Sequence, residues 1–165
     1  ATRFNEGQVR AMGRTARGVR GINLASGHKL ISLIVPKESG RILTVTENGY
    51  GKRTENAEFP AKGRGGKGVI AMSTSERNGS LVGAVQVWDG DEMMLISNQG
   101  TAVRTRVDEV SLLGRNTQGV RVIRTRDGEA LVSVSRIAED DDAAEPVQPV
   151  VTDENSDSGS NETEE

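Results

Sequence analysis

The sequence contains no cysteine and a single histidine, His28. Without thiols there is no disulfide framework and no thiolate metal site, and one imidazole cannot form a histidine cluster. Only four of the 165 residues are aromatic, and hydrophobic residues make up 34%. This composition provides little bulky material for one deep core. It therefore disfavours a metalloenzyme and favours several small cores.

Long apolar runs are also absent. No stretch approaches the ~20 apolar residues needed to cross a bilayer. The sequence does not open with a signal peptide either. We therefore expect a soluble, intracellular protein that makes no membrane contact.

Residues that could act as a nucleophile or a general base are scarce. The single tyrosine, Tyr50, lies between Gly49 and Gly51, a setting typical of a hairpin tip. We expect Tyr50 to pack or to contact a ligand rather than to act as a nucleophile. Residues 63–68 match the G-x-G-x-x-G pattern, but no βαβ unit surrounds them, which argues against dinucleotide binding.

A heptapeptide occurs three times: Gly-Arg, three variable residues, then Gly-Val. Its copies at 13–19, 63–69 and 114–120 are separated by 50 and 51 residues. A fixed period of this length is typical of a repeat architecture. Because Ala1 falls inside a repeat, we expect the sequence to be a piece of a longer polypeptide.

Short runs rich in Val, Ile and Leu alternate with turn dipeptides such as Asn48-Gly49 and Asp127-Gly128. This pattern predicts short strands joined by hairpins, about four in each repeat of about 50 residues. The expected strands are 19–24, 30–35, 41–46, 51–54, 69–73, 81–87, 93–97, 102–105 and 131–137. We expect the four strands of a repeat to form one small antiparallel sheet, the blade of a propeller-like disc.

The predicted fold is therefore all-β over residues 1–138. We place a blade remnant at 1–12, blades at 13–62 and 63–113, and the start of another at 114–138. A closed disc needs roughly 4 to 8 blades. We therefore expect an open arc.

Charge divides the chain into two parts. Residues 139–165 hold 11 of the 24 acidic residues and no Lys or Arg, so residues 1–138 carry all 21 basic residues and 13 acidic ones. The net charges are +8 for residues 1–138 and −11 for residues 139–165. Because 139–165 also contains hardly any apolar group, we predict a disordered acidic tail.

Fifteen of the 21 basic residues fall in three windows around the heptapeptides, 10–20, 52–67 and 104–126. Because these basic residues recur in each repeat, we expect them to line one rim of the disc. A rim of regularly spaced cations suits a polyanion such as duplex DNA. The alternative is that they only solvate the surface. The candidate DNA-binding residues are Arg14, Arg17, Arg20, Lys52, Arg53, Lys62, Arg64, Lys67, Arg104, Arg106, Arg115 and Arg121.

The second glycine of each heptapeptide, Gly18, Gly68 or Gly119, stands between a short loop and an expected strand. We predict a turn with positive φ at each of these positions. The glycines then serve turn geometry alone, or they also bring backbone N–H groups close to a phosphate.

Four segments closely resemble the C-terminal domains of bacterial DNA gyrase A subunits. They are residues 9–15 (VRAMGRT), 48–54 (NGYGKRT), 103–106 (VRTR) and 114–120 (GRNTQGV). The resemblance covers 1–138 nearly continuously, and an acidic tail is similar to that of many Gram-negative members.

The resemblance implies a six-bladed β-pinwheel whose basic perimeter wraps duplex DNA within a type II topoisomerase that introduces negative supercoils. It also implies that the protein acts in the bacterial cytoplasm. There it would be joined to the rest of the gyrase A polypeptide, which forms a homodimer, and would assemble with gyrase B in an A2B2 complex. The family's cleavage tyrosine has no counterpart here, and ATP and Mg²⁺ are used elsewhere in that complex. We therefore expect no catalytic residue, metal or cofactor in this chain. Residues 62–68 keep only part of the family's Gln-Arg-Arg-Gly-Gly-Lys-Gly box, as a degenerate copy.

Two alternatives remain. Topoisomerase IV has a related domain with more degenerate blades in its A-type polypeptide, and the match over 48–54 disfavours it. A non-catalytic propeller that serves as a protein–protein platform would bind its partner with little dependence on salt.

Overall fold

The computed structural model describes residues 1–138; the predicted acidic tail, 139–165, lies outside the described residues. The described part is all-β, as predicted, and its helices are single 3-10 turns. No helix in residues 1–138 has the length and apolar character needed to span a membrane. The strands are β1 (Arg41–Thr46), β2 (Tyr50–Glu55), β3 (Leu81–Val87), β4 (Glu92–Ser97), β5 (Ala102–Arg106), β6 (Val120–Arg121) and β7 (Leu131–Ile137), and the 3-10 turns are η1 (Glu6–Gln8), η2 (Asn56–Glu58) and η3 (Val107–Glu109).

Two hairpins have the same construction one repeat apart. The β1–β2 hairpin turns at Gly49 and the β4–β5 hairpin at Gly100, with φ of 77° and 83°. Each glycine N–H donates to the carbonyl at the end of the first strand, Thr46 at 3.1 Å or Ser97 at 3.2 Å. Positive φ at glycine suits the tight hairpin turns that the sequence predicts.

Each sheet takes its strands from successive repeats. Sheet one has the order β3-β1-β2-β6, and sheet two has the order β5-β4-β7. β3 joins β1 with Val87 opposite Arg41, and β7 joins β4 with Ile137 opposite Glu92, so both sheets are extended by a strand from the next repeat. The expectation that the strands of one repeat pair only with one another is wrong. The blade divisions of residues 1–138 remain predictions from the repeat pattern.

The expected strands at 19–24, 30–35 and 69–73 do not form. Residues 30–35 correspond to β3 and β7, each of which pairs with a hairpin of the preceding repeat. The described residues contain no earlier hairpin for 30–35 to join, and Leu33 and Val35 are therefore 86% and 81% exposed. The strand expected at 30–35 is therefore wrong: the apolar run is present, but the equivalent segments β3 and β7 form strands by pairing with a hairpin of the preceding repeat.

The core lies between the two sheets. Leu43 and Val45 of β1 face Met93 and Leu95 of β4, and all four are fully buried. Val107 of η3 is buried in the same cluster. At about 25 cal/mol for each Å² of apolar surface removed from water, these contacts are the main force that holds the sheets together.

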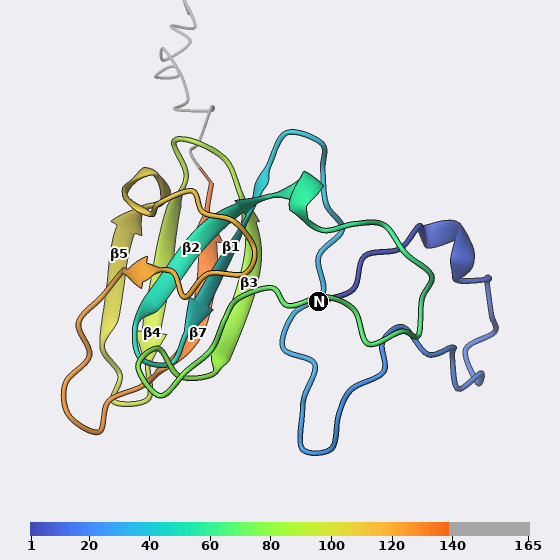
Figure 1. Ribbon diagram of the computed structural model, residues 1–165, viewed down its shortest axis with the longest axis horizontal. Coiled ribbons are helices and arrows are strands. Elements are labelled where there is room, and N and C mark those ends of the chain that lie inside the picture. Colours follow the sequence, from blue (N-terminus) through green and yellow to red (C-terminus); the bar gives the residue numbers. More distant parts are fainter. Residues whose placement is uncertain (139–165) are drawn as a thin grey trace, which may run out of the picture.

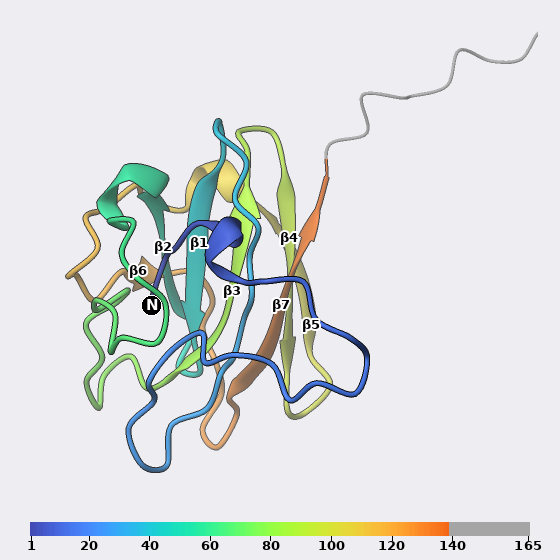
Figure 2. The ribbon, with the colours of Figure 1, turned by 90° about the vertical axis from the view of Figure 1, so that its right-hand side faces the viewer.

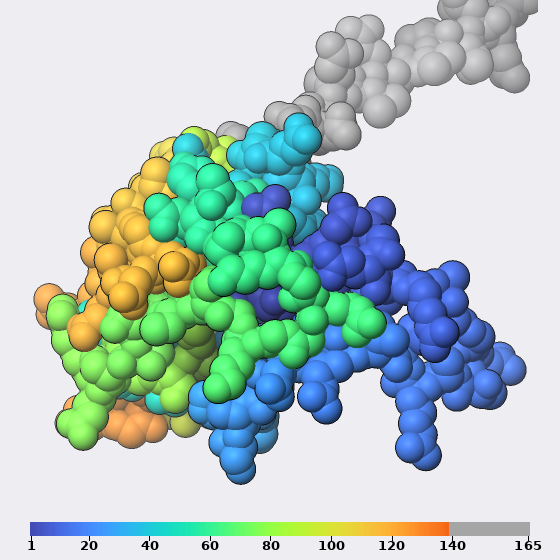
Figure 3. Space-filling model, turned by 45° about the vertical axis from the view of Figure 1, so that its right-hand side comes forward, coloured from blue at the N-terminus to red at the C-terminus, as the bar shows by residue number. Residues whose placement is uncertain are grey.

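The two sheets lie side by side, and residues 1–40 run along the flank of sheet one (Figures 1 and 2). In Figure 3 this N-terminal segment, drawn in blue, projects from the body as exposed loops. The first residues follow the repeat: Ala1 exchanges hydrogen bonds with Val69, as Gly51 pairs with Val120 in sheet one.

Candidate nucleic-acid interface

Arg115, the arginine of the third heptapeptide, is bound to the backbone of the two preceding repeats. Its Nε donates to the carbonyl oxygen of Glu58 at 3.1 Å, and its Nη1 donates to that of Ile70 at 2.6 Å. Carbonyls bound by a guanidinium form charge-assisted hydrogen bonds, which are stronger than neutral ones. Arg115 therefore links its own repeat to both repeats before it.

Arg64 makes the same contacts one repeat earlier. Its Nε donates to the carbonyl of Gln8 at 3.0 Å and its Nη1 to that of Arg20 at 3.1 Å. Arg14 is the equivalent residue in the first copy, and its side chain makes no hydrogen bond or ion pair within residues 1–138. We call Arg64 and Arg115 the anchored arginines, because their guanidinium groups already have acceptors.

The second glycines of the heptapeptide, Gly18, Gly68 and Gly119, have φ of 82°, 78° and 75°. At Gly119, an added Cβ would stand 2.6 Å from the carbonyl oxygen of Gly51, and at Gly68 one would stand 2.0 Å from that of Ala1. The same addition at Gly18 would meet nothing within 4 Å. In the second and third copies, the glycine therefore allows close approach to the backbone of an earlier repeat.

Lys52 is fully buried, so its placement on an exposed basic rim is incorrect. Its ammonium donates to the carbonyl oxygens of Gly114, at 2.8 Å, and Arg115, and to Oγ1 of Thr117 at 3.2 Å. Burial lowers the pKa of Lys52 to about 8, helped by the positive charge of Arg115 and opposed by Glu58. Lys52 fastens β2 to the heptapeptide of the third copy.

Three further candidates are engaged with protein groups. Arg53 donates from Nε to the carbonyl of Val110 at 2.7 Å and pairs with Asp89 at 2.8 Å, and its side chain is only 13% exposed. Arg104 pairs with Glu92, and Arg106 pairs with Asp108 at 3.3 Å. The Arg104 and Arg106 side chains are 58% and 64% exposed, so water competes with both pairs and weakens them.

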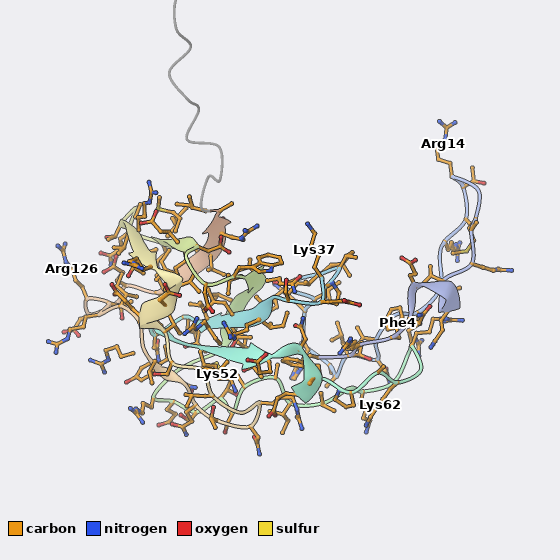
Figure 4. The ribbon with its side chains drawn as sticks, turned by 90° about the horizontal axis from the view of Figure 1, so that it is seen from above. Phe4, Arg14, Lys37, Lys52, Lys62 and Arg126 are labelled. Atoms are coloured by element: carbon orange, nitrogen blue, oxygen red, sulfur yellow. The ribbon has the colours of Figure 1, made fainter. Side chains whose placement is uncertain are left out.

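The remaining candidates, except Arg121, are exposed and make no side-chain hydrogen bond or ion pair to another residue of 1–138. Other basic residues of 1–138 share these properties, among them Arg124 and Arg126, which follow the third heptapeptide. Figure 4 shows Arg14, Lys62 and Arg126 pointing away from the body, whereas Lys52 lies within it. We use the name free cations for the members of this group that were sequence candidates or follow the third heptapeptide: Arg14, Arg17, Arg20, Lys62, Lys67, Arg124 and Arg126.

Sequence reasoning missed Arg77, Arg124 and Arg126 as binding candidates. Arg77 lies outside the three basic windows, whereas Arg124 and Arg126 lie inside the window 104–126 but are not among the candidates. One signal could have found two of them: Arg77 precedes Asn78-Gly79 and Arg126 precedes Asp127-Gly128. The same turn motif thus presents an exposed arginine in both repeats.

Arg121 meets Arg77 at the side chain of Tyr50. The Tyr50 hydroxyl oxygen accepts hydrogen bonds from Arg121 Nη2 at 2.8 Å and from Arg77 Nε at 3.2 Å. These bonds, that of Arg121 foremost, lower the pKa of the Tyr50 phenol. Tyr50 is 3% exposed, whereas both arginines are exposed.

Nothing in residues 1–138 gathers three or more potential metal ligands of the His, Cys, Asp or Glu type. The described site is therefore a set of cations around a β framework. Guanidinium and ammonium groups without protein acceptors suit phosphate oxygens, and residues 1–138 carry an excess of eight positive charges.

A family model described as "DNA gyrase C-terminal domain, beta-propeller" matches residues 3–37, 40–87 and 91–138. Among curated relatives, the DNA gyrase A protein of Pseudomonas aeruginosa is 60% identical over 137 residues, which is 83% of this chain. The match spans 15% of that relative. The chain is thus similar to a small part of a much longer protein.

Solved structures show the same fold. The structure of a DNA gyrase A C-terminal domain has a TM-score of 0.76 and 34% identity, and covers 82% of this chain and 46% of that one. The C-terminal domain of a DNA topoisomerase IV has a TM-score of 0.75 at 24% identity, and covers 81% and 42%. At that identity the second likeness concerns the fold alone.

Proposed function

Because the chain belongs to the DNA gyrase A C-terminal β-propeller family, we propose that it binds duplex DNA and bends it along its surface. In this proposal the free cations contact phosphates, and the anchored arginines and Lys52 hold successive repeats together. The two tasks are divided between basic residues of the same repeats. Heptapeptide 63–69 contains both kinds, with Arg64 anchored and Lys67 free.

The observation that supports this proposal is the recurrence of free cations beside each heptapeptide. Arg14 and Arg17 lie in the first copy, Lys62 and Lys67 border or lie in the second, and Arg124 follows the third. Duplex DNA carries a phosphate charge about every 1.7 Å along its axis, so cations spread over successive repeats match it better than they match a compact ligand. Phosphate contacts carry no base information, so little sequence preference is expected.

We place this activity in a polypeptide of the DNA gyrase A type. There the chain wraps DNA for ATP-dependent negative supercoiling by a type II topoisomerase, with two gyrase A and two gyrase B polypeptides in the bacterial cytoplasm at the chromosome. In this proposal, ATP and Mg²⁺ act elsewhere in that complex. The likeness to a topoisomerase IV domain, at 24% identity, concerns the fold and does not favour that alternative.

The test is a salt titration of DNA binding by the whole chain. Fluorescence anisotropy with a labelled duplex should give a plot of log K against log salt with a slope of about −0.9 for each phosphate contacted. A relaxed plasmid, resealed with the chain bound, should also change linking number if the bound DNA is wrapped with one hand.

A slope near zero would overturn the phosphate model and favour a protein–protein platform. Salt-dependent binding without any change in linking number would leave DNA binding in place and remove wrapping. Lys67→Gln provides a direct check, because the loss of one phosphate contact should make the slope less negative by about one.

A further inference from the structure

Three repeats meet at the side chain of Tyr50. Tyr50 begins β2, Arg121 ends β6 directly opposite it in the register, and Arg77 lies in the turn before β3. The guanidinium carbons of Arg77 and Arg121 are 5.0 and 5.3 Å from the centre of the Tyr50 ring. Both guanidinium groups therefore contact the ring and its hydroxyl oxygen together.

This arrangement brings two positive charges to one uncharged acceptor. Neither Arg77 nor Arg121 forms an ion pair with a carboxylate of residues 1–138. The nearby Glu47 carboxylate is bound by the N–H of Ser80 at 2.8 Å. Two guanidinium groups so placed repel each other, and the ring face and hydroxyl oxygen offset only part of that repulsion. An anion placed between the two arginines would offset the rest.

The backbone around Arg77 is fixed independently of its side chain. Asn48 Nδ2 donates to the carbonyl oxygens of Glu76 and Arg77 at 3.1 and 3.2 Å. The buried Asn78 accepts the N–H of Ser75 at 2.7 Å. A side chain that leaves a fixed backbone and rests on a buried phenol has lost much of its rotamer freedom before any ligand arrives, which favours binding.

We propose that Tyr50 is a positioning residue that holds Arg77 and Arg121 as a clamp on a single DNA phosphate. This inference rests on the proposed DNA-binding function and deepens it by naming one contact. Arg77 and Arg121 stay exposed while the phenol beneath them is buried, so the ligand meets the guanidinium groups and not Tyr50. The two arginines are preorganised, and Tyr50 acts only through them.

The test uses the whole chain, a labelled DNA duplex and the variants Tyr50→Phe, Arg77→Gln/Arg121→Gln and the triple combination. Tyr50→Phe keeps the ring and removes the acceptor oxygen. We therefore expect DNA affinity at low salt to fall about three- to tenfold, which corresponds to a coupling energy typical of residues in contact. The double variant should make the salt slope less negative by about one, as expected for one lost phosphate. Tyr50→Phe should have no further effect once both arginines are absent. Thermal unfolding of each variant checks the fold.

A spectroscopic measurement reports on the clamp directly, because Tyr50 is the only tyrosine. NMR of ¹³C-labelled tyrosine follows the ionisation of this one phenol with and without the duplex. A phosphate between the two arginines offsets their charge, so the pKa of Tyr50 should rise toward its ordinary value when DNA binds. A role of Tyr50 in folding alone would leave that pKa unchanged.

Several outcomes would overturn the clamp. These are an unchanged Tyr50 titration with DNA bound, a full Tyr50→Phe effect without the arginines, and a slope change of about two, which would mean two separate phosphates. If the double variant binds like the unaltered chain and both depend steeply on salt, the clamp is wrong and the proposed function stands. If the unaltered chain shows no salt-dependent binding, the proposed function fails and the clamp fails with it.

Discussion

Arg115 reaches back 45 residues along the chain to hold the carbonyl oxygen of Ile70 at 2.6 Å. Arg64 holds the carbonyl of Arg20 in the same way. In the second and third heptapeptides, the recurring arginine, which the sequence suggested as a phosphate-binding residue, thus links repeats by hydrogen bonds. The prediction that separates these roles compares an anchored arginine with a free one.

Arg115→Gln should lower the free energy of unfolding by about 1 to 2 kcal/mol, because two carbonyls lose a charged donor. Arg124→Gln, in the same repeat, removes a free cation and should change stability by less than about 0.5 kcal/mol. DNA binding should show the reverse order: the salt slope changes by about one for Arg124→Gln and stays the same for Arg115→Gln. Urea unfolding and anisotropy titrations measure both. Equal loss of slope in the two variants would contradict the division of roles.

Lys52→Met should destabilise the chain by about 2 to 4 kcal/mol, because the carbonyls of Gly114 and Arg115 lose their donor in a buried site. Lys62→Met, at an exposed position, should cost less than about 0.5 kcal/mol. Thermal unfolding by circular dichroism compares them. A Lys52→Met variant that is as stable as the unaltered chain but binds DNA more weakly would indicate that Lys52 contacts DNA.

Gly119→Ala and Gly18→Ala both place a side chain at positive φ, which costs about 1 to 2 kcal/mol. Only at Gly119 does the new Cβ also strike the carbonyl of Gly51 and the methyl of Met72. Overpacking adds about 1 to 3 kcal/mol, so Gly119→Ala should be the more destabilising change in chemical denaturation. Equal costs would show that turn geometry alone explains the glycine.

The hydrogen bonds of the Glu129 carboxylate should make the stability of the chain sensitive to acid. Hydrogen bonds from Ser97, Thr101 and the Arg126 N–H lower the pKa of the Glu129 carboxyl to about 2. Its folded pKa is lower than its unfolded pKa, so its stabilising contribution is present above pH of about 4.5 and is lost as pH falls toward about 2. Glu129→Gln should flatten the fall in unfolding free energy over that interval. Identical pH profiles for the two chains would rule this contribution out.

The local pattern predicted most strands but not their partners. The expected strands 41–46, 81–87 and 131–137 coincide with β1, β3 and β7, and the turns fall at Gly49 and Gly100. Alternation and turn residues are local properties, so they locate strands well. Pairing of β1 with a strand of the next repeat is set by how repeats stack, and the 30–35 segment shows that alternation alone does not make a strand.

The candidate site was predictable in composition and less so in placement. A guanidinium binds a backbone carbonyl and a phosphate by the same kind of hydrogen bond, so the sequence cannot tell Arg115 from Arg124. Lys52 was misplaced because one face of sheet one buries polar residues, among them Thr44, Thr46 and Thr54. When polar and apolar residues alternate along a strand, the polar face is normally expected to face solvent. In this chain, loops of later repeats cover the polar face of sheet one.

The sharing of strands between repeats also sets an order for folding during synthesis. β2 ends at Glu55, and its partner β6 begins at Val120, 65 residues later. At a translation rate of about 5 to 20 residues per second, the β2 edge waits about 3 to 13 s for that partner. During that interval the nascent chain exposes unpaired backbone N–H and C=O groups, which are open to pairing with other chains. A ribosome pause between the second and third heptapeptides would lengthen this exposure.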